Sequence, residues 1–143
     1  MNIKTNTIRI FLILVILVLP TGVVLAQSPG GDVVLFGQNY TLKSGDTLNG
    51  SIVVFGGNIQ IEEDAVVNGD IILFGGNLNL AGSASKEVVV IGCNATVSDE
   101  VSGDMVIIGG QVNLTSTSVV RGDVVAIGGQ VNREPGSQVS GNV

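Results

Sequence analysis

The sequence contains no histidine and no tryptophan, and its 143 residues include one cysteine and one tyrosine. Without histidine the chain lacks the commonest general base and the commonest metal ligand. The lone Cys93 can form no disulfide within the chain; we expect a buried small hydrophobe, and the alternative is a reactive thiol. With 6 Lys and Arg against 12 Asp and Glu, the chain also lacks the basic patch that binds nucleic acid.

The N-terminus has the composition of an export signal. Lys4 and Arg9 precede the apolar run "IFLILVILVLP", and "TGVVLAQ" then places Val24 and Ala26 where a signal peptidase reads. We therefore predict a signal peptide over residues 1–26 and a short linker over residues 27–31. The alternative is an uncleaved membrane anchor, because Ile8 to Ala26 is about long enough to span a bilayer. Either way, we expect the rest of the chain to be exported.

The remaining sequence, residues 32–143, is one repeat. Six units contain an apolar run followed by glycine: "DVVLFGQNYTL", "SIVVFGGNIQI", "DIILFGGNLNL", "EVVVIGCNATV", "DMVIIGGQVNL" and "DVVAIGGQVNR". The period is 17 to 19 residues, too short for helical repeats. Each unit holds an apolar run, an alternating segment such as "NLNL", and a weaker third segment such as "VVNG". Three short strands joined by glycine-containing corners form one coil, so the pattern predicts a three-sided parallel β-solenoid of about six coils.

Alternation after the glycines assigns side chains to the interior. We expect two inward columns, Tyr40, Ile59, Leu78, Ala95, Val112 and Val131, and Leu42, Ile61, Leu80, Val97 and Leu114, with Arg133 breaking the second column in the last coil. The third segment adds Leu48, Val67, Val101, Val120 and Val139. The residues between the first two columns should face solvent.

Two polar columns are expected at the corners. Asn39, Asn58, Asn77, Asn94, Gln111 and Gln130 should form an amide ladder, in which each side chain can donate to its neighbour. Asp32, Asp70, Asp104 and Asp123 share a second column with Ser51 and Glu87. Stacked carboxylates can signal cation binding, but a Gly-Asp turn whose carboxylate lies in water explains them as well. We favour the turn and predict no metal site and no cofactor.

The apolar runs are hydrophobic on both faces, which predicts that both faces are covered. Within each run two residues must face the core and two must face out. The bulk of the fourth residue suits the core, which places Phe36, Phe55, Phe74, Ile91, Ile108 and Ile127 there. The first and third residues of each run would then face outward as an apolar stripe. We hypothesise that this stripe mediates self-association or envelope contact, and that it comprises Val33, Leu35, Ile52, Val54, Ile71, Leu73, Val88, Val90, Met105, Ile107, Val124 and Ala126. The alternative is that residues beyond this chain, or a slight twist of the coil, shield the stripe.

No capping helix is evident beside the repeats. A solenoid must cap its terminal coils or leave open edges that pair with other chains. The final "GSQVSGNV" would be followed by another apolar run if the repeat continued. We expect either that more sequence follows or that another molecule completes the last coil.

The units "GSIVVFGGNIQI", "GDIILFGGNLNL" and "GDMVIIGGQVNL" resemble those of bactofilins, the polymer-forming cytoskeletal proteins. The resemblance covers residues 32–143. It implies a right-handed three-sided β-helix that polymerises end to end without nucleotide, and it implies no catalytic residues. Bactofilins of the well-known kind are cytoplasmic, whereas this chain has an export signal, so the resemblance points to an exported variant.

These observations predict a non-enzymatic structural protein that forms a filament or scaffold at the extracytoplasmic face of the membrane or at the cell surface. Its expected partner is itself, with the membrane or other envelope proteins as further candidates, and with no nucleic acid or small-molecule substrate. The alternative is an exported adhesin or surface-binding β-solenoid. An enzyme is disfavoured because basic residues are scattered and no long loop interrupts the repeats to form a cleft.

Overall fold

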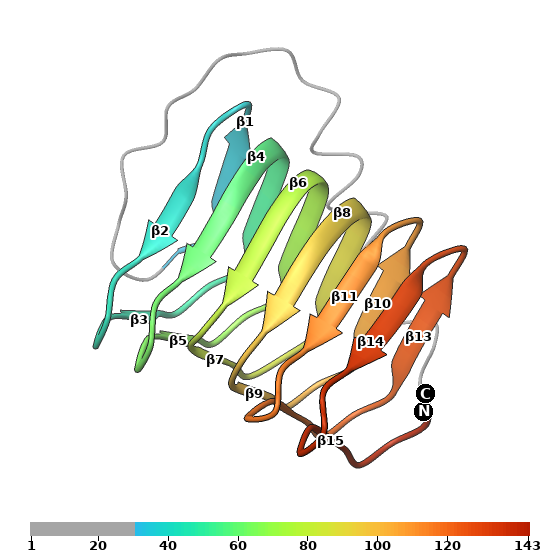
Figure 1. The fold of residues 1–143 in the computed structure, drawn as a ribbon. Coiled ribbons are helices and arrows are strands. Elements are labelled where there is room, and N and C mark those ends of the chain that lie inside the picture. The colour runs from blue at the N-terminus through green and yellow to red at the C-terminus, as the bar shows by residue number, and fades with distance from the viewer. Residues whose placement is uncertain (1–30) are drawn as a thin grey trace, which may run out of the picture.

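The computed structural model describes residues 31–143, which hold fifteen short β-strands and no helix (Figure 1). The predicted signal peptide and all but the last residue of the predicted linker lie outside these residues. Among residues 31–143, no helix is long and apolar enough to cross a membrane.

The strands follow the repeat, with two or three strands in each coil. In the middle coils the apolar run and the alternating segment join into one ten-residue strand. The coils and their strands are the first coil, 32–50, with β1 (Val33–Phe36), β2 (Tyr40–Leu42) and β3 (Thr47–Leu48); the second, 51–69, with β4 (Ile52–Ile61) and β5 (Val66–Val67); the third, 70–86, with β6 (Ile71–Leu80) and β7 (Ser83–Ala84); the fourth, 87–103, with β8 (Val88–Val97) and β9 (Glu100–Val101); the fifth, 104–122, with β10 (Met105–Ile108), β11 (Gln111–Leu114) and β12 (Val119–Val120); and the sixth, 123–141, with β13 (Val124–Ile127), β14 (Gln130–Arg133) and β15 (Gln138–Val139).

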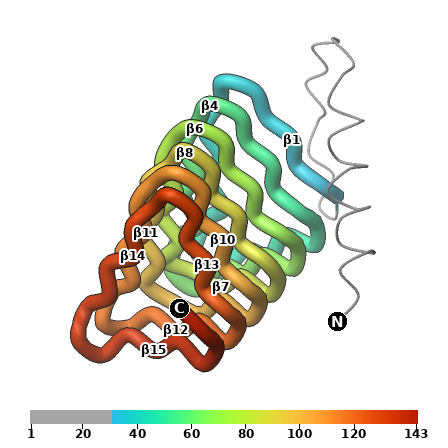
Figure 2. The backbone as a smooth tube through the Cα atoms, turned by 90° about the vertical axis from the view of Figure 1, so that its right-hand side faces the viewer, coloured from blue at the N-terminus to red at the C-terminus, as the bar shows by residue number. Residues whose placement is uncertain are grey.

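All strand pairs are parallel, and each joins one coil to the next. One sheet has the order β1-β4-β6-β8-β10-β13, with β2 beside β4 and β11 between β8 and β14. The second has the order β15-β12-β9-β7-β5-β3. Register follows the repeat, so that Ile52 pairs with Ile71 and Ile71 with Val88. The chain is therefore a parallel β-solenoid of about six coils, which confirms this part of the sequence prediction (Figure 2).

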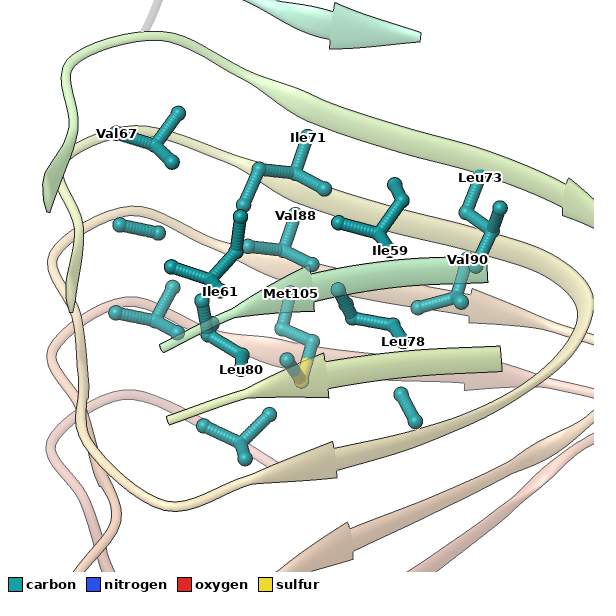
Figure 3. Packing of buried hydrophobic residues seen from close by; sticks show 14 of the residues in the cluster. Ile59, Ile61, Val67, Ile71, Leu73, Leu78, Leu80, Val88, Val90 and Met105 are labelled. Carbon is teal, nitrogen blue, oxygen red and sulfur yellow. The ribbon is translucent and has the colours of Figure 1, made fainter. Parts of the chain in front are cut away.

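The core is a set of inward columns between the two sheets. The columns through Leu78 and Leu80 point inward as predicted, and Leu80 is fully buried. The third segment contributes Val67 and, in the third coil, Ala84, which the sequence pattern missed because "SASK" lacks the glycine of the other units. Figure 3 shows Ile59, Leu78 and Val90 among the buried side chains that pack against one another across the interior. This packing holds the residues that alternate with the inward columns in register on the surface.

The coils differ in length at one corner. In the terminal coils six positions separate the buried Leu42 from Leu48, and likewise Arg133 from Val139, whereas four separate Leu80 from Ala84. The longer corners form hydrogen-bonded turns: Asp46 N–H donates to Lys43 O at 3.0 Å, and Ser137 N–H to Glu134 O at 3.1 Å. The third and fourth coils are therefore two residues shorter than the others, and the first and sixth coils have the same length.

Candidate assembly surfaces

The residues predicted to form the outward stripe lie in the core instead. Ile71, Leu73, Val88 and Val90 are 0% exposed, and Met105 is equally buried. The predicted stripe residues of the second to fifth coils are buried, and so is Val124 of the sixth. These buried residues are Ile52, Val54, Ile71, Leu73, Val88, Val90, Met105, Ile107 and Val124. The other members, Val33, Leu35 and Ala126, belong to the terminal coils, where Val33 and Leu35 pack partly against the core and Ala126 is exposed. The predicted assignment of this stripe to the surface is therefore wrong.

The cause is one backbone angle at the corner of each coil. Gly75 has φ +63°, a left-handed conformation that interrupts the twofold alternation of side chains within β6. Before Gly75 the inward residues are Ile71 and Leu73; after it they are Leu78 and Leu80. Counting back from Leu80 without this interruption selects the wrong face. The predicted inward placement of Phe36, Phe55, Phe74, Ile91, Ile108 and Ile127 is wrong for the same reason.

The outward face of the first sheet is nevertheless apolar. The second and fourth residues of each run form it, and several are well exposed: Phe36 is 59% and Ile127 58% exposed. Phe55 stacks between Phe36 and Phe74, with ring centroids 5.0 and 4.6 Å apart and planes within about 10°. The outward face of the first sheet comprises Val34, Val53, Ile72, Val89, Val106 and Val125, and Phe36, Phe55, Phe74, Ile91, Ile108 and Ile127. Of these residues Val53 alone is buried. We call this set the outer apolar face.

Within residues 31–143, the first and sixth coils leave strand edges and part of the core exposed. Within residues 31–143, β1 and β3 end the two sheets on one side, and β13 and β15 end them on the other (Figure 1). At the first coil Val33 and Leu35 are partly exposed, and at the sixth coil Val131 and Val139 are. An unpaired parallel edge above an apolar interior can accept a further coil.

The end coils also hold charged side chains at core positions or beside them. Arg133 pairs in register with Leu114, so it occupies the inward column that leucine fills elsewhere. Its Nη2 donates to the carbonyl oxygen of Ser137 at 3.3 Å. At the opposite end, burial raises the pKa of the Tyr40 hydroxyl, and the negative charge of Asp46 raises it further.

The carboxylate column holds successive coils together. Asp32 Oδ1 accepts from Ser51 N–H at 2.8 Å, and Asp104 Oδ1 accepts from Asp123 N–H at 2.8 Å. Each oxygen thus caps a backbone donor of the following coil, as a turn carboxylate does. Burial raises the pKa of Glu87, and the carboxylates of Asp70 and Asp104 raise it further. Across residues 31–143 no group of three or more His, Cys, Asp or Glu side chains is arranged to hold a metal ion.

The amide ladder forms as predicted in the first three coils. Asn58 Nδ2 donates to Asn39 Oδ1, and Asn77 Nδ2 donates to Asn58 Oδ1, each at 3.1 Å. The column continues in register through Asn94, Gln111 and Gln130. A second ladder was missed: Asn68 Nδ2 donates to Asn49 Oδ1 at 2.8 Å. The shared "NG" of "LNG" and "VNG" was its signal in the sequence.

Cys93 is buried at the corner of the fourth coil. Cys93 is 3% exposed and takes the place of the second glycine of the corner, with Sγ 2.8 Å from the Ile91 carbonyl oxygen. Burial raises the pKa of its thiol, which agrees with the expected buried small hydrophobe.

Arg121 forms a two-point contact with Glu100, Nε to Oε1 at 2.7 Å and Nη2 to Oε2 at 3.2 Å. Repeat reasoning did not find this pair, because its members lie 21 residues apart and off the period.

Comparison of the chain with models of known protein families, with curated proteins and with solved structures found no match in any of the three. The interpretation of its surfaces therefore depends on their geometry and chemistry.

Proposed function

We propose that this chain is a non-enzymatic structural protein that joins end to end into a filament or scaffold at the cell envelope, in the manner implied by its resemblance to bactofilins. In this proposal each coil is three-sided and winds to the right. The observation that carries it is the pair of open ends, where β1 and β13 lack an outer neighbour within residues 31–143 and partly exposed core residues lie beside them.

End-to-end contact would complete both ends at once. Those backbone groups of β13, β14 and β15 that have no partner within residues 31–143 would meet the backbone of another terminal coil, and residues such as Val139 and Leu35 would leave water. Burying apolar area contributes about 25 cal/mol per Å², and the strand pairs add backbone hydrogen bonds that no side chain needs to supply. Because every added copy presents a new open end, association continues into a polymer.

The location is proposed from the N-terminal sequence. Lys4 and Arg9 before a long apolar run, followed by Val24 and Ala26, support export with cleavage after Ala26. Mass spectrometry of the protein recovered from the host envelope would reveal an N-terminus at Gln27. An intact Met1 in a membrane-bound protein would instead support the anchor, and recovery in the cytoplasm would contradict export.

Filament formation is tested with the full chain purified in mild detergent. Electron microscopy and light scattering should show rods much longer than the single molecule, with a length that grows with protein concentration. A monodisperse monomer at high concentration would overturn the proposal. Binding of that monomer to cells or glycans would support the alternative, an adhesin that uses the solvent-facing columns.

A further inference from the structure

We propose that the outer apolar face packs against the same face of a second copy, so that two rods lie side by side with their first coils at the same end. The contact runs along the flank of the rod and uses no coil edge. It rests in part on the proposed end-to-end assembly and adds a lateral contact, which makes each filament two rods wide.

The outer apolar face is built of two continuous columns. The second residues of the apolar runs pair in register from coil to coil, as Val106 does with Val125, and so do the fourth residues, as Ile108 does with Ile127. The backbone groups of these strands bond within the sheet, so the face presents apolar side chains only. A sheet that is apolar on both faces is usually covered on both, and a second sheet is the common cover.

The two columns form a ridge and a groove. In the first coil Phe36 is 59% exposed and Val34 40%, and in the sixth coil Ile127 is 58% exposed and Val125 44%. The fourth residue is also the more exposed one in the second and fifth coils. The column of fourth residues therefore protrudes beyond the smaller side chains next to it.

Shape selects one orientation of the second copy. A twofold axis parallel to the rod runs the facing strands antiparallel, so that the ridge of each copy lies over the groove of the other. Ile108 then meets Val106 of the second copy, and every coil pairs a protruding side chain with a receding one. A twofold axis parallel to the strands would instead set ridge on ridge, with Ile108 against Phe55, and would leave a gap between the two grooves. Close packing favours the first arrangement.

The charges beside the face favour the same orientation. The carboxylate column, with five carboxylates and Ser51, comes directly before the apolar runs, whereas the uncharged glycine corner and the amide ladder follow them. With the first coils at the same end, the carboxylate column of each copy lies opposite the glycine corner and amide ladder of the other. The reversed rod would place two carboxylate columns opposite each other, and like charges repel.

The size of the face links lateral pairing to filaments. Six strands about 4.8 Å apart, each presenting four residues of about 3.3 Å, give a face of about 400 Å² in plan. Counted on both copies this is about 800 Å², below the roughly 1,200–2,000 Å² of a stable interface. Two single chains should therefore pair weakly, whereas two filaments repeat the contact at every copy and hold together through avidity.

Two other occupants of the face are disfavoured. A membrane with anionic lipids would repel the carboxylate column that borders the face. The apolar N-terminal run leaves with the signal peptide if cleavage follows Ala26. A second copy needs neither condition, because its own face supplies both the groove and the uncharged border.

Orientation is tested by cross-linking in isolated envelopes, before any detergent is added, with the full chain in a Cys93→Ala background. Facing sheets lie about 10 Å apart, which a short bis-maleimide spans. Differently tagged Val106→Cys and Ile108→Cys chains made together should give mixed dimers. Ile108→Cys with Phe55→Cys should give none, because three coils, about 14 Å, separate these positions along the rod.

Either of two cross-linking results would contradict the proposal. Mixed dimers from the Ile108 and Phe55 variants alone would overturn the orientation. Mixed dimers from neither pair would overturn the pairing itself, whether a membrane or the N-terminal run covers the face.

Filament width tests the contact separately. Ile91→Lys combined with Ile108→Lys would bury unpaired cations between the rods, so electron microscopy should show filaments one rod wide with half the mass per unit length. Thr96→Lys combined with Asn113→Lys is the matched control, because these are outward, partly exposed residues of the same two coils. The control should keep filaments two rods wide. Circular dichroism verifies that both variants stay folded.

The outcomes separate lateral pairing from the proposed function. If the unchanged chain forms long filaments only one rod wide, end-to-end assembly stands and the pairing is wrong. If it forms no filaments but the Val106 and Ile108 variants still cross-link, the pairing stands and end-to-end assembly is wrong. Filaments that stay two rods wide in the Ile91 and Ile108 variant would show that another surface holds the rods together and would overturn the proposed contact.

Discussion

The two faces of strand β6 are almost equally hydrophobic and have opposite roles. Ile71 and Leu73 face inward and are fully buried, whereas Ile72 and Phe74 face outward and are partly exposed. The inward pair packs against the other strands and against the second sheet, as Figure 3 shows for Ile71 and Leu73. In the outward pair, Phe74 stacks on Phe55 of its own column. Hydrophobicity therefore does not decide which residues make the core of this solenoid; the corner geometry does.

The largest contrast between the faces is expected for a charged substitution. Leu73→Asp should unfold the rod or lower its stability by more than about 4 kcal/mol, because it removes a core side chain and buries an unpaired carboxylate. Phe74→Asp, one residue along, should cost about 1 kcal/mol, mainly the loss of ring stacking. Chemical denaturation followed by circular dichroism measures both. Equal effects would show that the two faces are equivalent and would contradict the assigned alternation.

The corner that separates the faces can be tested next. A Cβ on Gly76 would lie 1.8 Å from the carbonyl oxygen of Gly57 in the preceding coil, whereas a Cβ on Gly75 would meet nothing within 4 Å. Gly76→Ala must therefore push two coils apart, and we expect a loss of about 3 kcal/mol or more. Gly75→Ala should cost only the left-handed backbone conformation, about 1 kcal/mol. Thermal unfolding of the two variants compares them; a milder effect at Gly76 than at Gly75 would refute the close approach.

The repeat, the parallel solenoid and the columns after the glycines could all be predicted from the sequence. Those features depend on local alternation, as in "NLNL", and on a period that any six aligned units reveal. The face of the apolar runs could not, because every residue from Ile71 to Phe74 is apolar and only the angle at Gly75 sets the phase. The bulk of Phe55 and Phe74 was misleading, since stacked rings are also stable outside the core. The ion pair of Arg121 with Glu100 depends on side-chain reach between coils of unequal length, which a period does not encode.

The contribution of the outer apolar face to stability can be tested at its stacked rings. Phe55 contacts a ring on each side, while Phe36 contacts one. Phe55→Leu removes two ring contacts and keeps an apolar side chain, so we expect a loss of about 1 to 2 kcal/mol, given that each aromatic pair adds about 0.5–1.5 kcal/mol beyond burial. Phe36→Leu should cost about half as much. Denaturation midpoints that rank the two in the opposite order would indicate that stacking does not stabilise this face.

The smallest effect is expected for Glu87, a partly buried member of the carboxylate column. Burial and the charges of Asp70 and Asp104 raise the pKa of Glu87 above its unfolded value, so ionised Glu87 destabilises the folded state. This cost is absent below the unfolded pKa and develops as the pH rises through the folded pKa. Glu87→Gln should therefore raise the melting temperature slightly at pH 7, where it should increase the free energy of unfolding by less than about 1 kcal/mol. Near pH 4 the substitution should bring no such increase. Glu63→Gln, an exposed carboxylate of the second coil, is the control. A benefit of Glu87→Gln that grew as the pH fell would contradict the assigned sign, because it would mean that the folded coil favours the charged form.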